Sequence, residues 1–355
     1  MTTPLARSIA QRIRATGPIT LADYMQICLM DPRHGYYATR DPFGAKGDFT
    51  TAPEIHQMFG ELCGLALAQT WIDQGRPSPF ALAELGPGRG TLMADMLRAM
   101  RQAPGMTDAA QVVLIEASAH LRQVQRDRLG AAARHLDGVE ELPDKPLFLI
   151  ANEFFDALPV RQYQRGPDGW HERLVGASDD GSLRLGLGPV VALPRPGRPG
   201  DVVEECPAAP AIVESLARRI AARGGAAILI DYGGWNGYGD TFQALRNHRP
   251  EDPLAYPGEA DLTAHVDFAP LAAAAIRAGA VVSRPIRQGD WLLSLGAAQR
   301  AERLAAAGDA QAMTALRRLT HPDEMGHLFK AIAIWPKGAP PVPGFDALRL
   351  HADHA

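Results

Sequence analysis

The chain has 355 residues, 46% of them hydrophobic, and a formal net charge of −4. That length allows one large or two medium domains with a substantial core. The slightly acidic balance, without a dense Lys/Arg block, argues against nucleic acid as the main partner, because phosphate contacts need a basic face. Three widely spaced cysteines, Cys28, Cys63 and Cys206, argue against a disulfide framework and against a metal site.

The sequence contains no apolar run of membrane-spanning length, and its amino terminus lacks the core of a signal peptide. We therefore expect a cytoplasmic protein with no membrane insertion. The sequence is compatible with a homodimer but does not specify the oligomeric state.

Residues 1–75 are predicted to form an N-terminal helical segment that acts as a lid. Apolar residues at helical spacing predict helices over 5–13 and 21–30, with Thr20 as a cap for the second. A loop rich in glycine, proline and aromatic residues follows, and such loops are typically functional. Its last part, 47–54, is equally well explained as a surface loop leading into a helix over 55–71.

Residues 81–93 have the pattern of a strand, a tight loop and a helix. A short apolar run predicts a buried parallel strand, and leucines and methionines then recur at helical spacing. Gly86, Gly88 and Gly90 in the loop leave the backbone bare, so a ligand can lie against it. Open α/β folds bind their ligands at this edge of the sheet.

The spacing of these glycines indicates which ligand binds there. A dinucleotide fingerprint has its third glycine where this chain has Thr91, which disfavours an NAD oxidoreductase. Glu84, two residues before the first glycine, suits a ligand with a cationic amino-acid end. The loop therefore favours S-adenosylmethionine, and a purely structural turn is the alternative.

A second apolar run, residues 111–115, ends in Glu116. This acid follows Gly90 by about 26 residues, near the spacing at which an acid binds ribose hydroxyls. An ordinary solvated glutamate is the alternative. Together with the glycines, Glu116 predicts an adenosine-type ligand on a Rossmann-like sheet.

The remaining chain is predicted to complete an α/β core over residues 76–336. Alternating residues predict an antiparallel insertion at about 160–205, and a second insertion, at about 234–268, has the composition of a loop. The other predicted elements are a helix over 119–129, a weak strand near 134–142, strands over 147–152, 226–233, 281–287 and 329–335, helices over 211–223 and 270–278, and two helices within 291–319. Residues 337–355 are predicted to be a loose tail.

Five blocks of sequence, in this order, together resemble the MidA family. They are Gly47-Asp48-Phe49-Thr50-Thr51-Ala52-Pro53-Glu54-Ile55, Glu84-Leu85-Gly86-Pro87-Gly88-Arg89-Gly90, Asn152-Glu153-Phe154-Phe155-Asp156-Ala157-Leu158-Pro159, Asp231-Tyr232-Gly233 and Asp261-Leu262-Thr263-Ala264-His265-Val266-Asp267-Phe268. The resemblance implies an S-adenosylmethionine-dependent methyltransferase with a Rossmann-like seven-stranded sheet, an N-terminal lid and substrate-binding insertions.

Mitochondrial members of this family are complex I assembly methyltransferases that dimethylate an arginine of a complex I subunit symmetrically. The resemblance therefore implies a protein arginine methyltransferase whose partner is a complex I subunit. Because the chain shows no transit peptide, we expect a bacterial relative. A small-molecule methyltransferase, or a non-catalytic assembly protein that keeps the cofactor fold, are the alternatives.

The expected site residues come from the same blocks. Glu153 and Asp156 would grip a guanidinium bidentately, although a pair of acids capping a turn is the plain alternative. His265 and Asp267 would accept a proton or bind the substrate, and an ordinary loop histidine is equally compatible. The expected cofactor-binding residues are Thr51, Pro53, Glu54, Glu84, Gly86, Pro87, Gly88, Gly90, Glu116 and Asn152. Asp231 and Tyr232 are expected to have structural roles.

Overall fold

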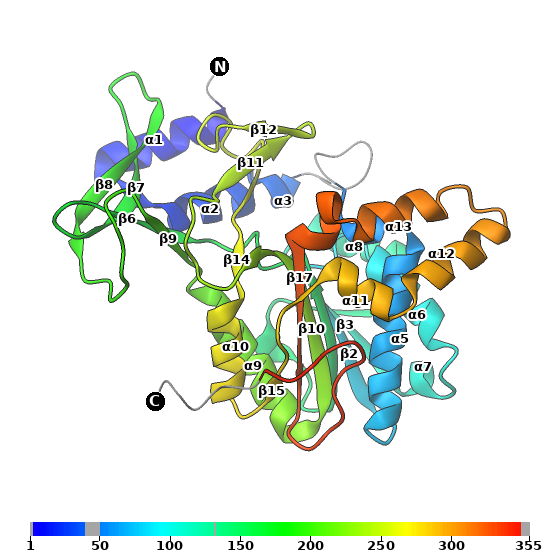
Figure 1. Ribbon diagram of the computed structural model, residues 1–355. Coiled ribbons are helices and arrows are strands. Elements are labelled where there is room, and N and C mark those ends of the chain that lie inside the picture. Colours follow the sequence, from blue (N-terminus) through cyan, green and yellow to red (C-terminus); the bar gives the residue numbers. More distant parts are fainter. Residues whose placement is uncertain (1–2, 40–49, 131–132, 349–355) are drawn as a thin grey trace. The chain divides into compact units, whose positions relative to one another are not determined.

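The computed structural model describes residues 3–39, 50–130 and 133–348 (Figure 1). The chain forms two compact units, each assembled from three stretches. The first unit comprises Met1–Thr50, Phe155–Ala209 and Gly234–Asp267, and the second comprises Thr51–Phe154, Pro210–Gly233 and Phe268–Ala355. This division differs from the predicted one, because residues 3–39 belong with the antiparallel segments and residues 51–75 belong with the core.

The second unit is built on a large, mostly parallel sheet. Its strands follow the order β15-β17-β10-β5-β2-β3-β4, and neighbours from β10 to β4 are parallel, whereas β17 is antiparallel to β10 and β15. This arrangement confirms the predicted Rossmann-like α/β class. The strands are β2 (Phe80–Leu85), β3 (Ala110–Ile115), β4 (Ala133–Leu136), β5 (Leu147–Asn152), β10 (Gly225–Gly234), β15 (Val281–Val282), β16 (Ile286–Arg287), which pairs with β17, and β17 (Phe329–Trp335).

Helices cover both faces of this sheet, with α5 and α6 on one side and α9 and α10 on the other (Figure 1). The helices are α4 (Ala52–Ile55), α5 (Gln57–Asp73), α6 (Thr91–Met100), α7 (Met106–Ala109), α8 (Ala119–Leu129), η2 (Val139–Glu141), α9 (Ala208–Arg223), α10 (Phe268–Arg277), α11 (Gln288–Ser294), α12 (Ala297–Ala306), α13 (Ala312–Thr320) and η3 (Pro322–Gly326).

Two glycines one turn apart bring α5 against α6, the helix that follows the glycine loop. A Cβ at Gly60 would lie 2.6 Å from the Asp95 Cβ, and one at Gly64 would lie 2.8 Å from the Met96 Cα. Only glycine allows backbones to approach this closely. The contact fixes the start of α6 relative to the chain that enters α5.

The first unit holds two antiparallel sheets. One has the order β1-β7-β6-β9 with β8 also paired to β7, as predicted for residues 160–205, and the other has the order β12-β11-β13. Its elements are α1 (Pro4–Thr16), β1 (Ile19–Thr20), α2 (Leu21–Met30), α3 (Tyr36–Thr39), β6 (Arg161–Arg165), β7 (Trp170–Ala177), β8 (Leu183–Val191), β9 (Val202–Glu205), β11 (Gln243–Arg246), β12 (Arg249–Glu251), β13 (Asp261–Thr263) and β14 (Val266–Asp267).

Several predicted elements differ from the structure. The stretch 234–267 is not simply a loop, because its short strands pair and bury Ala244 and Leu262 in the core of the first unit. The weak strand near 134–142 ends at Leu136, and η2 follows it. The first of the two helices predicted within 291–319 is interrupted. Gly296 has a left-handed φ of 90° and separates α11 from α12, and α13 follows.

The carboxyl-terminal stretch 337–348 is packed onto the second unit, so the prediction of a loose tail is wrong for these residues. Val342 and Phe345 are 1% and 5% exposed and belong to the main hydrophobic cluster. The Trp291 indole N–H donates to the Pro343 carbonyl at 3.1 Å. Composition alone suggested a tail because three prolines stand within residues 340–343, and prolines do not reveal long-range packing.

Candidate active site

Strand register places three predicted polar residues on one face of the parallel sheet. Glu84 of β2 is level with Ile150 of β5 and with Leu114 of β3. Side chains alternate along a strand, so residues two apart project to the same side. Asn152 stands two residues after Ile150, and Glu116 two residues after Leu114, so both project to the same side as Glu84. The three side chains therefore share the face covered by α5 and α6, at the carboxyl edge, where such sheets bind ligands.

The glycine loop joins β2 to α6 at the same edge. Gly86, Gly88 and Gly90 have φ values of 60°, 51° and 75°, a left-handed conformation that other residues rarely adopt. The Gly86 N–H donates to the Ile115 carbonyl at 3.0 Å, and the ring of Phe154 would lie only 2.9 Å from a Cβ at Gly86. The backbone conformation and the close packing of Phe154 against Gly86 thus require glycine in this loop.

Glu84 is a buried acid with one open oxygen. It is 3% exposed, and burial raises the pKa of its carboxyl to about 8, while a hydrogen bond from the Met93 N–H lowers it and the charge of Glu116 raises it. Among the described residues, its Oε2 and the Oδ1 of Asn152 are buried acceptors without a hydrogen-bond donor. Two open acceptors on one face fit the ammonium group of an amino acid.

Glu116 is held in place by protein donors. Its Oε1 accepts from the Ser118 N–H at 2.7 Å, and its Oε2 accepts from the side-chain amide of Gln125 at 3.3 Å. Burial raises its pKa, and the hydrogen bond from Ser118 opposes that rise. An oriented carboxylate of this kind, at the end of the strand next to that of Glu84, suits the paired hydroxyls of a ribose.

The segment 51–54 lies against the glycine loop, as its predicted role requires. The Ala52 N–H donates to Glu153 Oε1 at 2.9 Å. Glu54 accepts from the Thr91 hydroxyl and lies 3.7 Å from the Arg89 guanidinium. Its function as a lid remains a prediction, and residues 47–49 of the same sequence block lie outside the described residues.

Glu153 adopts a strained backbone conformation at the end of β5. Its φ is 53°, and non-glycine residues in this region concentrate at functional sites. Its N–H donates to the Ile230 carbonyl, and the Asn152 amide donates to its Oε1 at 2.9 Å. Buried Asp231 supports the same turn by accepting from the Phe154 N–H, in agreement with the structural role expected for it.

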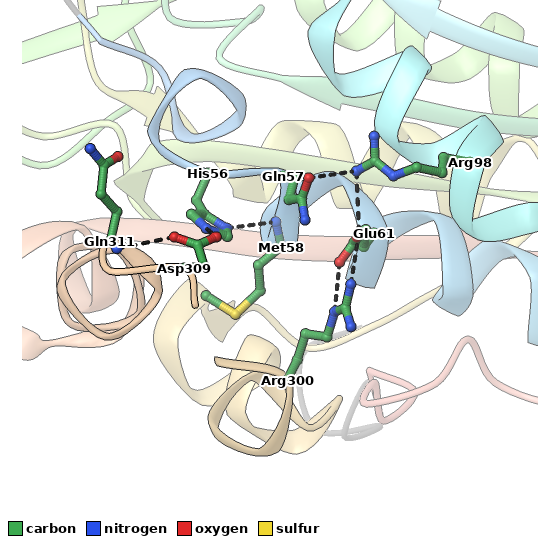
Figure 2. A network of polar contacts seen from close by, with 8 residues as sticks. All are labelled: His56, Gln57, Met58, Glu61, Arg98, Arg300, Asp309 and Gln311. Atoms are coloured by element: carbon green, nitrogen blue, oxygen red, sulfur yellow. Dashed lines mark hydrogen bonds and ion pairs between the residues drawn. The ribbon is translucent and has the colours of Figure 1, made fainter. Parts of the chain in front are cut away.

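A network of polar contacts anchors α5 immediately after the segment 51–54 (Figure 2). The helix predicted over 55–71 is α5, which begins at Gln57. His56 separates it from α4, because its backbone is extended and its Nδ1 accepts from the Met58 N–H and caps α5. Its Nε2 lies 2.9 Å from Asp309. Further along α5, buried Glu61 binds Arg300 of α12 through two hydrogen bonds, at 2.8 and 3.0 Å.

Three of the predicted catalytic residues belong to the first unit. Asp156 is buried there, and its carbonyl accepts from the Ala264 N–H. His265 is exposed and its N–H donates to the Thr241 hydroxyl, while Asp267 is half-buried beside Gly237. Their catalytic roles stay predictions from the sequence, as does that of Glu153 in the second unit.

Sequence reasoning missed several residues that contact the predicted site. Gln125, Arg89 and Thr91 contact Glu116 or the segment 51–54. Gln125 lies on a predicted helix with no motif of its own, so its role appears only from three-dimensional contacts. Among the described residues, no group of three or more His, Cys, Asp or Glu side chains is arranged to hold a metal ion. In the same part of the chain, no helix is both long and apolar enough to cross a bilayer.

A Rossmann-like sheet with a bare glycine loop, a ribose-type acid and open acceptors for an amino-acid end defines an S-adenosylmethionine-dependent methyltransferase. The model of the S-adenosyl-L-methionine-dependent methyltransferase family Methyltransf_28 matches residues 62–286, and the chain belongs to this family. The predicted MidA resemblance and the predicted cofactor, S-adenosylmethionine, are thereby confirmed.

Relatives and a solved structure agree with this assignment. The mitochondrial protein arginine methyltransferase NDUFAF7 of Homo sapiens is 37% identical over 94% of this chain and 84% of its own length. The NDUFAF7 protein of Xenopus tropicalis is 35% identical over 96% and 89%. A COG1565 superfamily member from Burkholderia thailandensis, solved with S-adenosylhomocysteine, is 31% identical with a TM-score of 0.84, covering 96% of this chain and 93% of that one.

Proposed function

We propose that this methyltransferase modifies an arginine side chain of a protein. The observation that carries the proposal is the similarity, over nearly the whole chain, to relatives named protein arginine methyltransferases. A match of that extent includes the first unit as well as the cofactor-binding sheet, so it is not limited to the part common to many methyltransferases.

The acids at the sheet edge support the proposal chemically. When bound, S-adenosylmethionine supplies an electrophilic methyl group on a sulfonium. A guanidinium stays protonated in proteins and is repelled by that positive charge. A carboxylate such as that of Glu153 offsets the repulsion, fixes the guanidinium plane and favours positive charge on the nitrogens that do not react.

The methyl group would leave the sulfonium, whose sulfur becomes the neutral thioether of S-adenosylhomocysteine, and would join one guanidinium nitrogen. That nitrogen would then release a proton. Glu153 is one candidate for orienting the guanidinium, and Asp156 is the second acid expected from the sequence. His265 and Asp267 are the residues expected to take the proton or to bind the peptide around the arginine.

The expected partner is a subunit of respiratory complex I, because the mitochondrial relatives of the MidA family act in its assembly. A bacterial, cytoplasmic location and a homodimer are further parts of the proposal. A small-molecule methyltransferase and a non-catalytic assembly protein are the outcomes that would replace it.

Mass spectrometry of complex I from a deletion strain tests the proposal. The strain should show an arginine that is unmethylated and that regains its methyl groups when the wild-type gene is restored. Complementation with Glu153→Gln should restore less than about 1% of the modification. The glutamine oxygen can still accept from Ala52 and Asn152, but the side chain lacks the negative charge that binds a guanidinium.

Binding of S-adenosylhomocysteine to purified Glu153→Gln serves as the control and should stay within about two-fold of wild type. An unchanged methylation map in the deletion strain would refute the arginine assignment and leave the cofactor assignment intact.

A further inference from the structure

Gln125 of α8 connects two parts of the cofactor site. Its side chain is 0% exposed. Its Nε2 donates to the Gly88 carbonyl at 2.6 Å and to Glu116 Oε2 at 3.3 Å. One amide group therefore bonds both the glycine loop and the acid that suits the ribose.

The glycine loop is shaped to receive this side chain. A Cβ at Gly90 would lie 3.5 Å from the Gln125 Cγ and 3.3 Å from the Leu129 Cδ1. A larger residue at position 90 would therefore press on α8. The loop and α8 pack as one assembly, although residues 90 and 125 are far apart in the sequence.

The chemistry of the contacts fixes the orientation of the amide. Gly88 and Glu116 both present acceptors, so the nitrogen and not the oxygen of Gln125 must face them. The amide oxygen then faces His135 of β4, whose Nε2 lies 2.8 Å away. His135 must donate there, so its Nε2 carries a proton. Burial lowers the pKa of His135, and the positive charges of Arg122 and Arg126 lower it further.

We propose that Gln125 is a positioning residue for the cofactor, and that His135 holds its amide in the working orientation. Gln125 keeps the Gly88 carbonyl and the Glu116 carboxylate at the separation that the ribose end of S-adenosylmethionine requires. Without its two N–H donors, two buried acceptors face each other, and each favours moving towards water. The loop and the acid then no longer present their ligand-binding atoms together.

Calorimetric titration with S-adenosylhomocysteine tests this role in Gln125→Met, which has similar length but no hydrogen bonds. We expect its Kd to rise about ten-fold or more, the effect of leaving a buried acceptor unsatisfied. Gln123→Met is the matched control, because Gln123 is exposed on the same helix and bonds only Arg126 and Asp127 among the described residues. Its Kd should stay within two-fold of wild type.

A double-mutant cycle separates positioning from general stability. If Gln125 acts through Glu116, then Gln125→Met combined with Glu116→Gln should weaken binding by clearly less than the product of the two single losses. If Gln125 had only a structural role, Gln125→Met would lower the melting temperature of the free protein but leave the Kd of the folded protein for S-adenosylhomocysteine unchanged. That result would overturn the proposal.

Substitutions at half-buried His135 keep the test decisive if Gln125→Met fails to fold. His135→Leu removes the donor to the amide oxygen and should raise the Kd about three-fold or more. His135→Gln supplies a replacement N–H and should bring the Kd back towards the wild-type value. Equal Kd values for wild type and both variants would contradict the role of this contact.

Discussion

Glu84 of the parallel sheet and Glu204 of the first unit are both buried acids, but their oxygens are engaged differently. Glu204 of β9, in the first unit, is 6% exposed and accepts from the Gln162 amide at 2.6 Å. It also accepts from the N–H groups of Thr241 and Phe242, both at 3.0 Å, and from the Thr241 hydroxyl. Both of its oxygens are in use.

Glu84, at the edge of the parallel sheet, is similarly buried but keeps Oε2 without a donor among the described residues. A buried acceptor left open costs free energy unless a ligand completes it. Burial of an acid therefore does not by itself reveal its role. Glu204, with both oxygens engaged by protein donors, organises the chain, whereas the open oxygen of Glu84 indicates where a polar ligand is bound.

Gly88→Val should have the largest effect on ligand binding. Valine is strained at a φ of 51°, and its side chain would occupy the bare face of the loop. We expect S-adenosylhomocysteine affinity to fall more than about 100-fold, or about 3 kcal/mol, measured by calorimetry. Gly186→Val is the control, because a Cβ there meets no atom within 4 Å; weakened binding in that variant would remove the specificity of the result.

Glu204→Ala should lower the stability of the fold without affecting ligand binding. It leaves four donors without their acceptor, so the free energy of unfolding should fall by about 3 kcal/mol in urea titrations. The Kd for S-adenosylhomocysteine should not change. Glu205→Ala is the neighbouring control, since Glu205 makes a partly exposed contact with Arg195 and should cost less than about 1 kcal/mol. Equal losses for both variants would contradict the structural role assigned to the buried contacts of Glu204.

Glu84→Gln should change the pH dependence of stability. The pKa of Glu84 is raised to about 8 in the folded protein by burial, from 4.5. The folded state therefore binds one more proton than the unfolded state between these values, and its stability falls as pH rises from about 5 to about 8. The glutamine variant should lack this decline, gaining up to about 4 kcal/mol relative to wild type at pH 8.

The same substitution should weaken ligand binding, because an ammonium group favours the ionised form of Glu84. Wild-type affinity for S-adenosylhomocysteine should rise between pH 6 and pH 8, and the variant's affinity should stay flat. Exposed Glu141→Gln serves as the control for both measurements. A wild-type protein whose stability does not decline over this pH range would show that the carboxyl is not in the environment described.

Asp309→Ala should have the smallest effect. It removes the partner of His56 Nε2, but the cap of α5 by His56 Nδ1 remains. We expect the melting temperature of Asp309→Ala to fall by at most about 3 °C. Asp309→Asn should melt close to wild type, because its amide oxygen can still accept a hydrogen bond from His56 Nε2. A fall of the same size in both variants would indicate that charge, rather than hydrogen bonding, holds this contact.

The parts of the site fixed by local pattern and strand register could be predicted from the sequence. The glycine loop, Glu116 and the end of β5 follow from apolar runs whose polar residues stand directly after the last strand residue. The helix over 119–129 and the strand over 329–335 were predicted with the observed bounds, since Ser118 and Gly130 flank the helix and Pro336 follows the strand.

Contacts between distant segments could not be predicted. Gln125, His56 and Asp309 carry no motif, and their partners are known only once helices and strands are packed together. The paired strands within 234–267 and the packing of Phe345 were missed for the same reason. Their short runs of sequence have turn composition, and tertiary contacts rather than local propensity decide their structure.

A crystal structure of the protein grown with S-adenosylhomocysteine tests the central claim most directly. It should place the ribose hydroxyls on the Glu116 carboxylate, and the ammonium group within hydrogen-bond distance of Glu84 Oε2 or Asn152 Oδ1. The ligand bound elsewhere, with those two acceptors still buried and open, would contradict the account.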